Sequence, residues 1–127
     1  PIKESGQLKF IKGKGPIIKN YNFSFDILTF DGHTEKQMLP LLKYKKEIIV
    51  FAGDLIPTIG HIPVPYIMGY DTRPLKTLEE KSLFLDKALK NNYLLFMEHD
   101  AANELISLKK TEKGVRFKES YKFDTYF

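Results

Sequence analysis

Cysteine is absent from this 127-residue sequence, and its absence narrows the chemistry open to the chain. Disulfide bonds and thiolate metal sites are excluded, so a bound metal ion would depend on imidazole and carboxylate groups. Tryptophan is also absent, and only three histidines are present, at positions 33, 61 and 99. Each histidine can therefore be considered separately as a possible metal ligand.

The sequence also lacks a hydrophobic run of membrane-spanning length, and its amino terminus has no signal-peptide pattern. Together with the missing cysteines, this predicts a cytoplasmic protein without a membrane partner. The length suits one domain, or a large part of one, over residues 1–127. The chain begins at Pro1, which fits either removal of an initiating methionine or a cut inside a longer polypeptide.

A clustered charge of one sign is missing as well. Twenty lysines and arginines face sixteen acidic residues, a modest basic excess. Nucleic-acid binding would call for basic residues on one face with aromatics between them. Here the lysines alternate with apolar residues in strand-like segments, so we expect no nucleic-acid partner. A basic nucleic-acid-binding module is the third interpretation, and it depends on charge alone.

The chain is organised around residues 47–58, which read EIIVFAGDLIPT. The run at 48–52 is mostly β-branched or aromatic, too short for a helix, and closed by Gly53. It predicts a strand buried on both faces. Asp54 follows where that strand leaves the sheet. In open α/β sheets ligands gather at the carboxyl ends of strands, so Asp54 is a candidate functional residue.

Two other predicted strands end in the same way. The run at 23–27 leads towards His33, and the run at 93–97 leads to His99. A single histidine is more often structural than a ligand. The shared placement of His33, Asp54 and His99 at strand exits nevertheless predicts a metal site. Imidazole and carboxylate suit zinc, manganese or iron.

The remaining apolar patterns predict an antiparallel meander and, at the carboxyl end, a hairpin. Pro40 lacks a backbone donor and is expected to place its strand at an edge or at a bulge. Residues 13–16 have the composition of a turn. Besides 48–52, the predicted strands are 8–12, 17–19, 23–27, 37–42, 93–97, 104–110 and 114–119.

One long helix is predicted before Asn91. The sequence TLEE at 77–80 is a capping-box pattern, in which the Thr77 oxygen accepts from the Glu80 amide and that carboxylate reaches back. Lys81 and Lys87 fall away from the apolar face of this helix. That face contains Leu78, Leu85, Ala88 and Leu89.

The helix joins the strand at 48–52 to the strand at 93–97. Such a strand–helix–strand crossover makes the two strands parallel. The predicted fold class is therefore α/β (α+β), with a mixed sheet and one long covering helix.

The segment at 55–71 has neither helical nor strand periodicity. It is long for a simple connection, and long ordered loops of this kind are often functional. Two interpretations are open: the loop forms the wall of a pocket, or it packs over the core. A pocket wall would account for five apolar residues that otherwise have no element to bury them: Ile62, Val64, Tyr66, Ile67 and Met68.

These motifs together carry a resemblance. GHT at 32–34, FAGD at 51–54 and EHD at 98–100 resemble the last three metal-binding motifs of the metallo-β-lactamase superfamily. The segment 53–71, with TLEEK at 77–81, resembles the branch that includes lactonase-like and methyl-parathion-hydrolase-like proteins. The resemblance covers nearly the whole chain after about Lys9.

The resemblance implies a four-layer αββα sandwich made of two similar halves. The superfamily's HxHxDH motif would lie upstream of GHT and does not occur in this sequence. We therefore expect residues 1–127 to be the carboxyl-terminal half of such a domain. Its partner would be the missing amino-terminal half, or a second copy through self-association.

Roles for individual residues also follow from the resemblance. His33 would complete one metal site, His99 would complete the other, and Asp54 would bridge both as the central catalytic group. His61, Tyr66 and Tyr70 would line the substrate pocket. Two divalent ions are expected, zinc first.

The function implied by the resemblance is metal-dependent hydrolysis of a small-molecule ester, lactone or phosphoester. In some lactonases a tyrosine lies shortly after the bridging aspartate and polarises the substrate carbonyl. Pro57 occupies that neighbourhood here. The alternative is a non-catalytic structural or interaction module of the same fold.

Overall fold

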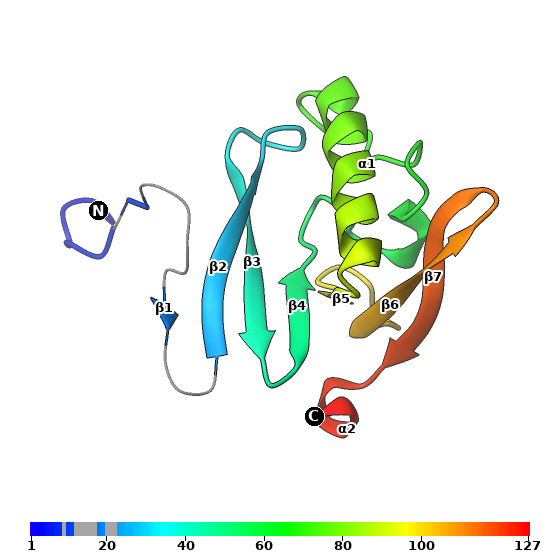
Figure 1. Cartoon of the computed structure of the whole chain (residues 1–127). Helices are drawn as coiled ribbons and strands as arrows, with labels where there is room; N and C mark the ends of the chain where they lie inside the picture. Colours follow the sequence, from blue (N-terminus) through cyan, green and yellow to red (C-terminus); the bar gives the residue numbers. More distant parts are fainter. Residues whose placement is uncertain (9, 12–17, 20–22) are drawn as a thin grey trace.

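The computed structural model describes residues 1–8, 10–11, 18–19 and 23–127. In this part of the chain, seven strands form one mixed sheet whose order follows the sequence (Figure 1). The helix α1 (Pro74–Lys90) lies across one face of the sheet. The strands are β1 (Ile18–Lys19), β2 (Phe23–Phe30), β3 (Gln37–Tyr44), β4 (Glu47–Phe51), β5 (Leu94–Phe96), β6 (Leu105–Thr111) and β7 (Gly114–Tyr121).

The directions of the strands place their carboxyl ends at one edge. β4 and β5 are parallel, as the crossover predicts, and every other neighbouring pair is antiparallel. β2 is separated from β4 by one antiparallel strand, so β2 runs in the same direction as β4. The segments that follow β2, β4 and β5 therefore leave the sheet at the same edge. The predicted α+β fold class is confirmed.

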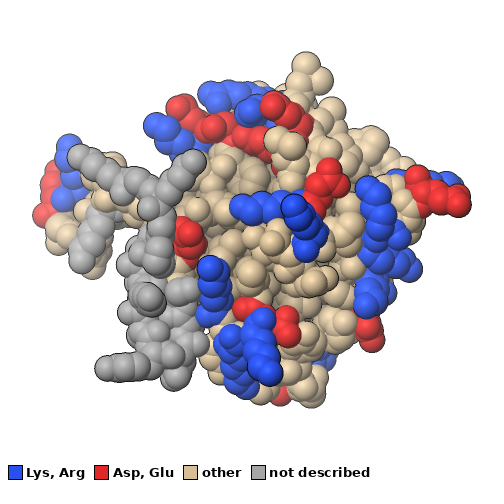
Figure 2. Space-filling model, viewed as in Figure 1, with Lys and Arg blue, Asp and Glu red and all other residues tan. Residues whose placement is uncertain are grey.

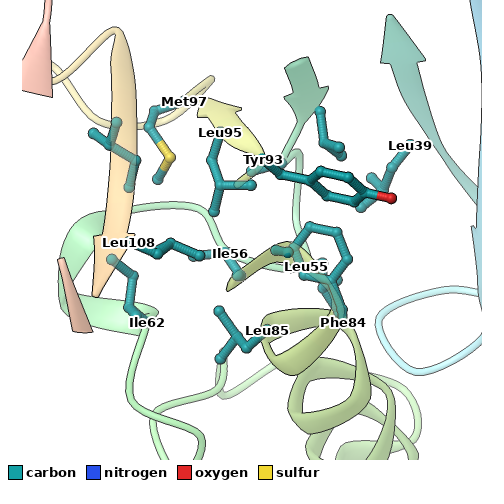
Figure 3. Close-up of a cluster of buried hydrophobic side chains, with 14 of the residues drawn as sticks. Leu39, Leu55, Ile56, Ile62, Phe84, Leu85, Tyr93, Leu95, Met97 and Leu108 are labelled. Atoms are coloured by element: carbon teal, nitrogen blue, oxygen red, sulfur yellow. The ribbon is translucent and has the colours of Figure 1, made fainter. Parts of the chain in front are cut away.

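The main hydrophobic core lies between α1 and the sheet (Figure 3). Val50, Leu95 and Ile106 come from neighbouring strands and are completely buried. Leu85 and Ala88 of α1 pack in the same cluster, as their helical spacing predicts. Burying one large aliphatic side chain contributes about 1.5–3 kcal/mol. This core fixes the strand ends relative to the helix.

The start of α1 differs from the prediction. The helix begins at Pro74, with Arg73 as its N-cap, so Thr77 lies in the first turn and is buried. Proline at the first helical position costs no hydrogen bond, because that amide has no partner within a helix. The prediction of a capping box at Thr77 and Glu80 is therefore wrong. Lys81 is also fully buried on the inner face.

Pro40 is accommodated differently from the expectation. β3 is an interior strand between β2 and β4, and it pairs with β2 through Pro40 without a bulge, so both expected placements, edge and bulge, are wrong. Pro40 pairs with Ile27 of β2, whereas the pairing of β3 with β4 starts only at Leu41. The residue without an amide hydrogen thus sits just beyond the β4 ladder.

The amino-terminal segment departs from the predictions, and the carboxyl end adds a short helix to the predicted hairpin. Of the strand expected at 8–12, Leu8, Phe10 and Ile11 are described and are not in a strand. Its other two residues, the turn at 13–16 and Ile17 lie outside the described residues. The carboxyl-terminal hairpin is confirmed as β6 and β7. The short helix α2 (Phe123–Tyr126) follows β7 and was not predicted, because a single helical turn is too short to show helical periodicity.

The face of the sheet opposite α1 is apolar. Ile49, Leu94 and Leu105 are buried there in a second, smaller cluster. Each of them precedes a residue of the main core, because side chains alternate between the two faces of a strand. Beside this cluster lies an apolar groove of about 260 Å³. The groove is lined by Pro40, Leu42, Ile49, Phe51, Phe96 and Phe123.

Charged side chains are mixed on the face shown in Figure 2. Lysine and arginine occur in several separate places there, most with aspartate or glutamate beside them. The expected lack of a nucleic-acid partner stays a prediction. Within the described ranges, no helix has the length and apolar character needed to cross a membrane.

Candidate metal centre

Three side chains meet at the edge where β2, β4 and β5 end. His99 Nε2 lies 3.1 Å from Asp54 Oδ1, and His33 Nε2 lies 3.6 Å from Asp54 Oδ2. The two imidazoles thus face different oxygens of one carboxylate. A carboxylate between two imidazoles can hold two cations, one through each oxygen. Asp54 is about one-third exposed and is reachable from solvent.

The His33 ring is fixed by a residue that the sequence analysis did not single out. His33 Nδ1 lies 2.9 Å from Asp71 Oδ1, and the Asp71 side chain is 1% exposed. A carboxylate can only accept, so Nδ1 carries the hydrogen and the lone pair of a neutral ring is at Nε2. Metal-ligating histidines usually donate their second N–H to such a carboxylate.

Gly32 beside His33 is packed against α1. A Cβ at this position would lie 2.4–2.6 Å from Thr77 Oγ1, N and Cα. The backbone therefore passes the helix at a distance that only glycine allows. The Gly32 carbonyl also accepts a hydrogen bond from the Arg73 amide at 2.9 Å.

Substituting Gly32→Ala is expected to destabilise the fold by about 2 kcal/mol, as overpacking typically does. The strain falls on the segment that carries His33, because the Thr77 backbone belongs to the helix and cannot retreat. Urea unfolding measures the loss, with Gly69→Ala as the control, since nothing lies within 4 Å of a Cβ there. Equal stability of the two variants would contradict the close approach.

The segment after β5 is tied to the segment after β4. The Asp100 carboxylate accepts a hydrogen bond from the Ile59 amide at 3.0 Å and from the Asn103 side chain at 2.9 Å. Burial pushes the pKa of Asp100 upward, but the hydrogen bonds from Ile59, Ala102 and Asn103 outweigh it and hold the pKa below its usual value. Asp100 therefore stays ionised and fixes the neighbourhood of His99, which is itself half exposed.

The predicted pocket residues occupy different environments. Tyr70 meets the His33 ring edge-on, with the centroids 6.2 Å apart. Tyr66 is 61% exposed. His61 ends the 3-10 turn η1 (Ile59–His61), and its Nδ1 pairs with Thr58 Oγ1 at 2.8 Å. Of the three predicted pocket residues, Tyr70 is thus the one that contacts the candidate metal ligands, through His33.

The loop at 55–71 is partly core and partly surface. Ile62 and Met68 are buried, and Ile62 belongs to the main core cluster. For these two residues the structure favours packing over the core rather than a pocket wall. Val64 is partly buried against the same core.

Gln37 also contributes to the site. It opens β3 opposite Phe30, the last residue of β2, and its Nε2 lies 3.5 Å from Asp54 Oδ2. The antiparallel hairpin could have indicated this, because the first residue of β3 returns to the edge that β2 leaves. Asp71 had no such signal.

The side chains fit part of a metal ligand set. Two imidazoles and a carboxylate are suitable donors for zinc, manganese or iron. The described part of the chain contains no group of three or more histidine, aspartate or glutamate side chains placed to hold a metal ion. A catalytic metal ion commonly uses about three protein ligands. The roles of His33, Asp54 and His99 as ligands therefore stay predictions.

Comparison with known proteins gives the fold. No protein-family model matches the sequence, and no curated protein matches it significantly. Solved structures do match. A probable metal-dependent hydrolase from Staphylococcus aureus superposes with a TM-score of 0.71 and 16% identity, over 93% of this chain and 42% of that one. The chain has the fold of part of a metallo-β-lactamase domain.

Two further structures agree. AidC, a dizinc quorum-quenching lactonase, gives a TM-score of 0.71 and 20% identity over 93% of this chain and 40% of that one. AbOPH, a hydrolase in the β-lactamase superfamily, gives a TM-score of 0.67 and 21% identity over 77% of this chain and 35% of that one. The three neighbours are thus a probable metal-dependent hydrolase, a dizinc lactonase and a hydrolase of the β-lactamase superfamily, and this chain spans at most 42% of their length.

Proposed function

We propose that this chain supplies His33, Asp54 and His99 to a two-metal hydrolytic site. The observation that carries the proposal is the arrangement of both Nε2 atoms around one carboxylate, 3.1 and 3.6 Å from its two oxygens. With the Nδ1 hydrogen of His33 donated to Asp71, a neutral ring presents its lone pair to Asp54. Two electron-rich groups facing each other favour a cation between them.

Each residue has a distinct part in this proposal. His33 Nε2 would hold one ion, His99 Nε2 the other, and Asp54 would give one oxygen to each. Asp71 keeps the His33 ring in the tautomer that binding needs. When bound, two divalent ions supply a hydroxide at neutral pH and stabilise the developing oxyanion. Zinc is the first choice, and manganese or iron would also suit these donors.

The substrate would be a small molecule with an ester, lactone or phosphoester group. Tyr70 lies against His33 and would form the nearest part of the pocket wall. Tyr66 and His61 come from the same loop and would contact the substrate farther out. We propose that this chain belongs to the branch of the superfamily that includes lactonase-like and methyl-parathion-hydrolase-like proteins.

A complementary polypeptide is part of the proposal. The apolar groove opposite α1, with the half-buried Leu42 and Phe96 in its lining, is typical of a sheet face that packs against another layer. The chain spans at most 42% of the superposed hydrolases. We propose that the amino-terminal half of the domain, with an HxHxDH motif and the remaining ligands, covers this face.

The isolated 127-residue chain is therefore expected to bind zinc weakly and to leave esters, lactones and phosphotriesters intact. It should self-associate through its apolar face. Light scattering and metal analysis of the purified chain measure both properties. A monomer holding two tight metal ions would contradict the proposal.

The complete protein provides the complementary test. The reading frame upstream of Pro1 should encode HxHxDH, and its full product should carry two metal ions and hydrolyse one of these substrate classes. A full product that binds no metal would instead favour a non-catalytic module of the same fold.

A further inference from the structure

The backbone before His33 is held by a side chain of α1. Both oxygens of Glu80 lie 3.0 Å from the Asp31 amide, and Oε2 also lies 2.9 Å from the Gly32 amide. Both amides donate to an ionised acceptor, which makes these hydrogen bonds stronger than bonds between neutral groups. A capping box would have turned Glu80 towards its own helix, but it instead reaches a segment 48–49 residues away in the sequence.

The carbonyl side of the same segment is held by the residues just before α1. The His33 carbonyl accepts hydrogen bonds from the Thr72 amide at 3.1 Å and from Thr72 Oγ1 at 2.8 Å. Asp71 holds the ring itself. Glu80 supplies the hydrogen bonds that hold the amide side. The backbone of residues 31–33 is therefore held by hydrogen bonds at its amides, from Glu80, and at its carbonyl side, from Thr72, while Gly32 lies against the helix.

We propose that Glu80 is a positioning residue, which directs the His33 imidazole towards Asp54 by fixing the two amides before it. The proposal deepens the proposed function, since the alignment is useful only if His33 holds a metal ion. Glu80 does not touch the imidazole. It acts through the backbone of Asp31 and Gly32.

Glu80→Gln tests the proposal. Glutamine keeps the length of the side chain but removes its charge and replaces one acceptor oxygen with an N–H group. In either orientation of the amide, this N–H group would face the Asp31 amide, because both Glu80 oxygens meet that donor. Hydrogen exchange at the Asp31 and Gly32 amides should accelerate in the 127-residue chain. Exchange at Val50 and Leu95, in the central strands, should keep its wild-type rate.

Zinc titration of the complete protein provides the functional readout. Losing an outer partner of a metal ligand typically costs about 10- to 100-fold in affinity. Because Glu80 bonds the backbone before His33 and not the imidazole itself, Glu80→Gln should weaken binding of the zinc ion at His33 by about tenfold, the lower end of this range, and leave the zinc ion at His99 unchanged. A purely structural role would weaken both ions together or neither.

Glu79→Gln is the matched control, because Glu79 is exposed and, among the residues that the structure describes, pairs with Lys76 alone, at 3.1 Å. Glu80→Asp provides a second variant. Its shorter side chain keeps the charge but moves the carboxylate away from the Asp31 and Gly32 amides, so hydrogen exchange at both amides should also accelerate. Unchanged exchange in Glu80→Gln, or an equal effect of Glu79→Gln, would overturn the positioning role. If the wild-type protein binds no zinc, the proposed function fails, whereas the exchange rates still decide whether Glu80 holds the segment.

Discussion

Asp54→Asn in the complete protein is expected to abolish two-metal loading and to lower turnover at least about a hundredfold, more than loss of an outer partner costs. Asparagine keeps the shape of the side chain but removes the negative charge that faces both imidazoles. It also places an N–H group where one carboxylate oxygen meets His33 or His99. Metal analysis and the rate of ester, lactone or phosphoester hydrolysis measure the two losses.

Two comparisons make this result specific. Asp86→Asn removes the same charge from an exposed position on α1 and should leave metal content and rate unchanged. His61→Ala should chiefly change KM or substrate preference, because His61 pairs with Thr58 rather than with Asp54. Normal metal content and rate in Asp54→Asn would end the bridging role.

The meeting of His33, Asp54 and His99 could be anticipated because it depends on strand direction. Short apolar runs with turn residues after them marked β2, β4 and β5, and a helix between β4 and β5 made those two parallel. The meander added one antiparallel strand between β2 and β4. Strands that run the same way end at the same edge, so local patterns sufficed to bring three distant residues together.

The residues that support these three could not be anticipated in the same way. Asp71 ends an irregular segment, and its contact with His33 depends on how that segment returns to the sheet. Glu80 matched a local capping pattern, but the helix starts one turn earlier, at Pro74, and frees its carboxylate for Asp31 and Gly32. For Glu80 a tertiary contact outweighed a local signal, and for Asp71 no local signal existed.

Lys81 shows the limit of helical periodicity most clearly. A lysine is assigned to the solvent face because burying an unpaired charge is costly. Here the side chain is fully buried, and its Nζ lies 3.0 Å from the His61 carbonyl and 2.6 Å from the Tyr66 carbonyl. A third acceptor, the Pro63 carbonyl, lies at 3.2 Å. The partners come from an irregular loop, so no period in the sequence predicts them.

Lys81→Met is expected to destabilise the chain by about 3 kcal/mol, because three backbone carbonyls lose the donor that they share. Methionine fills a similar volume but cannot donate to the three carbonyls. The loop that carries His61 and Tyr66 would then lose its connection to α1. Urea unfolding followed by circular dichroism measures the loss, since the chain has no tryptophan to report it.

The same substitution tests how burial affects the ammonium group. Burial lowers the pKa of Lys81 to about 8, and the charge of Asp71 opposes the shift only in part. Between pH 8 and 10.5 the unfolded chain therefore binds this proton while the folded chain releases it. The free energy of unfolding should rise with pH in that window, by at most about 1.4 kcal/mol per pH unit.

The difference between wild type and Lys81→Met isolates this contribution, because other titrating groups affect both proteins equally. That difference should be constant below pH 8 and should grow above it, whereas Lys87→Met, at an exposed position on the same helix, should show no such trend. A difference that stays constant up to about pH 10.5 and shrinks only above it would mean that the three carbonyls stabilise the ammonium more than burial penalises it. The sign of the slope thus decides which of the two effects governs the buried lysine.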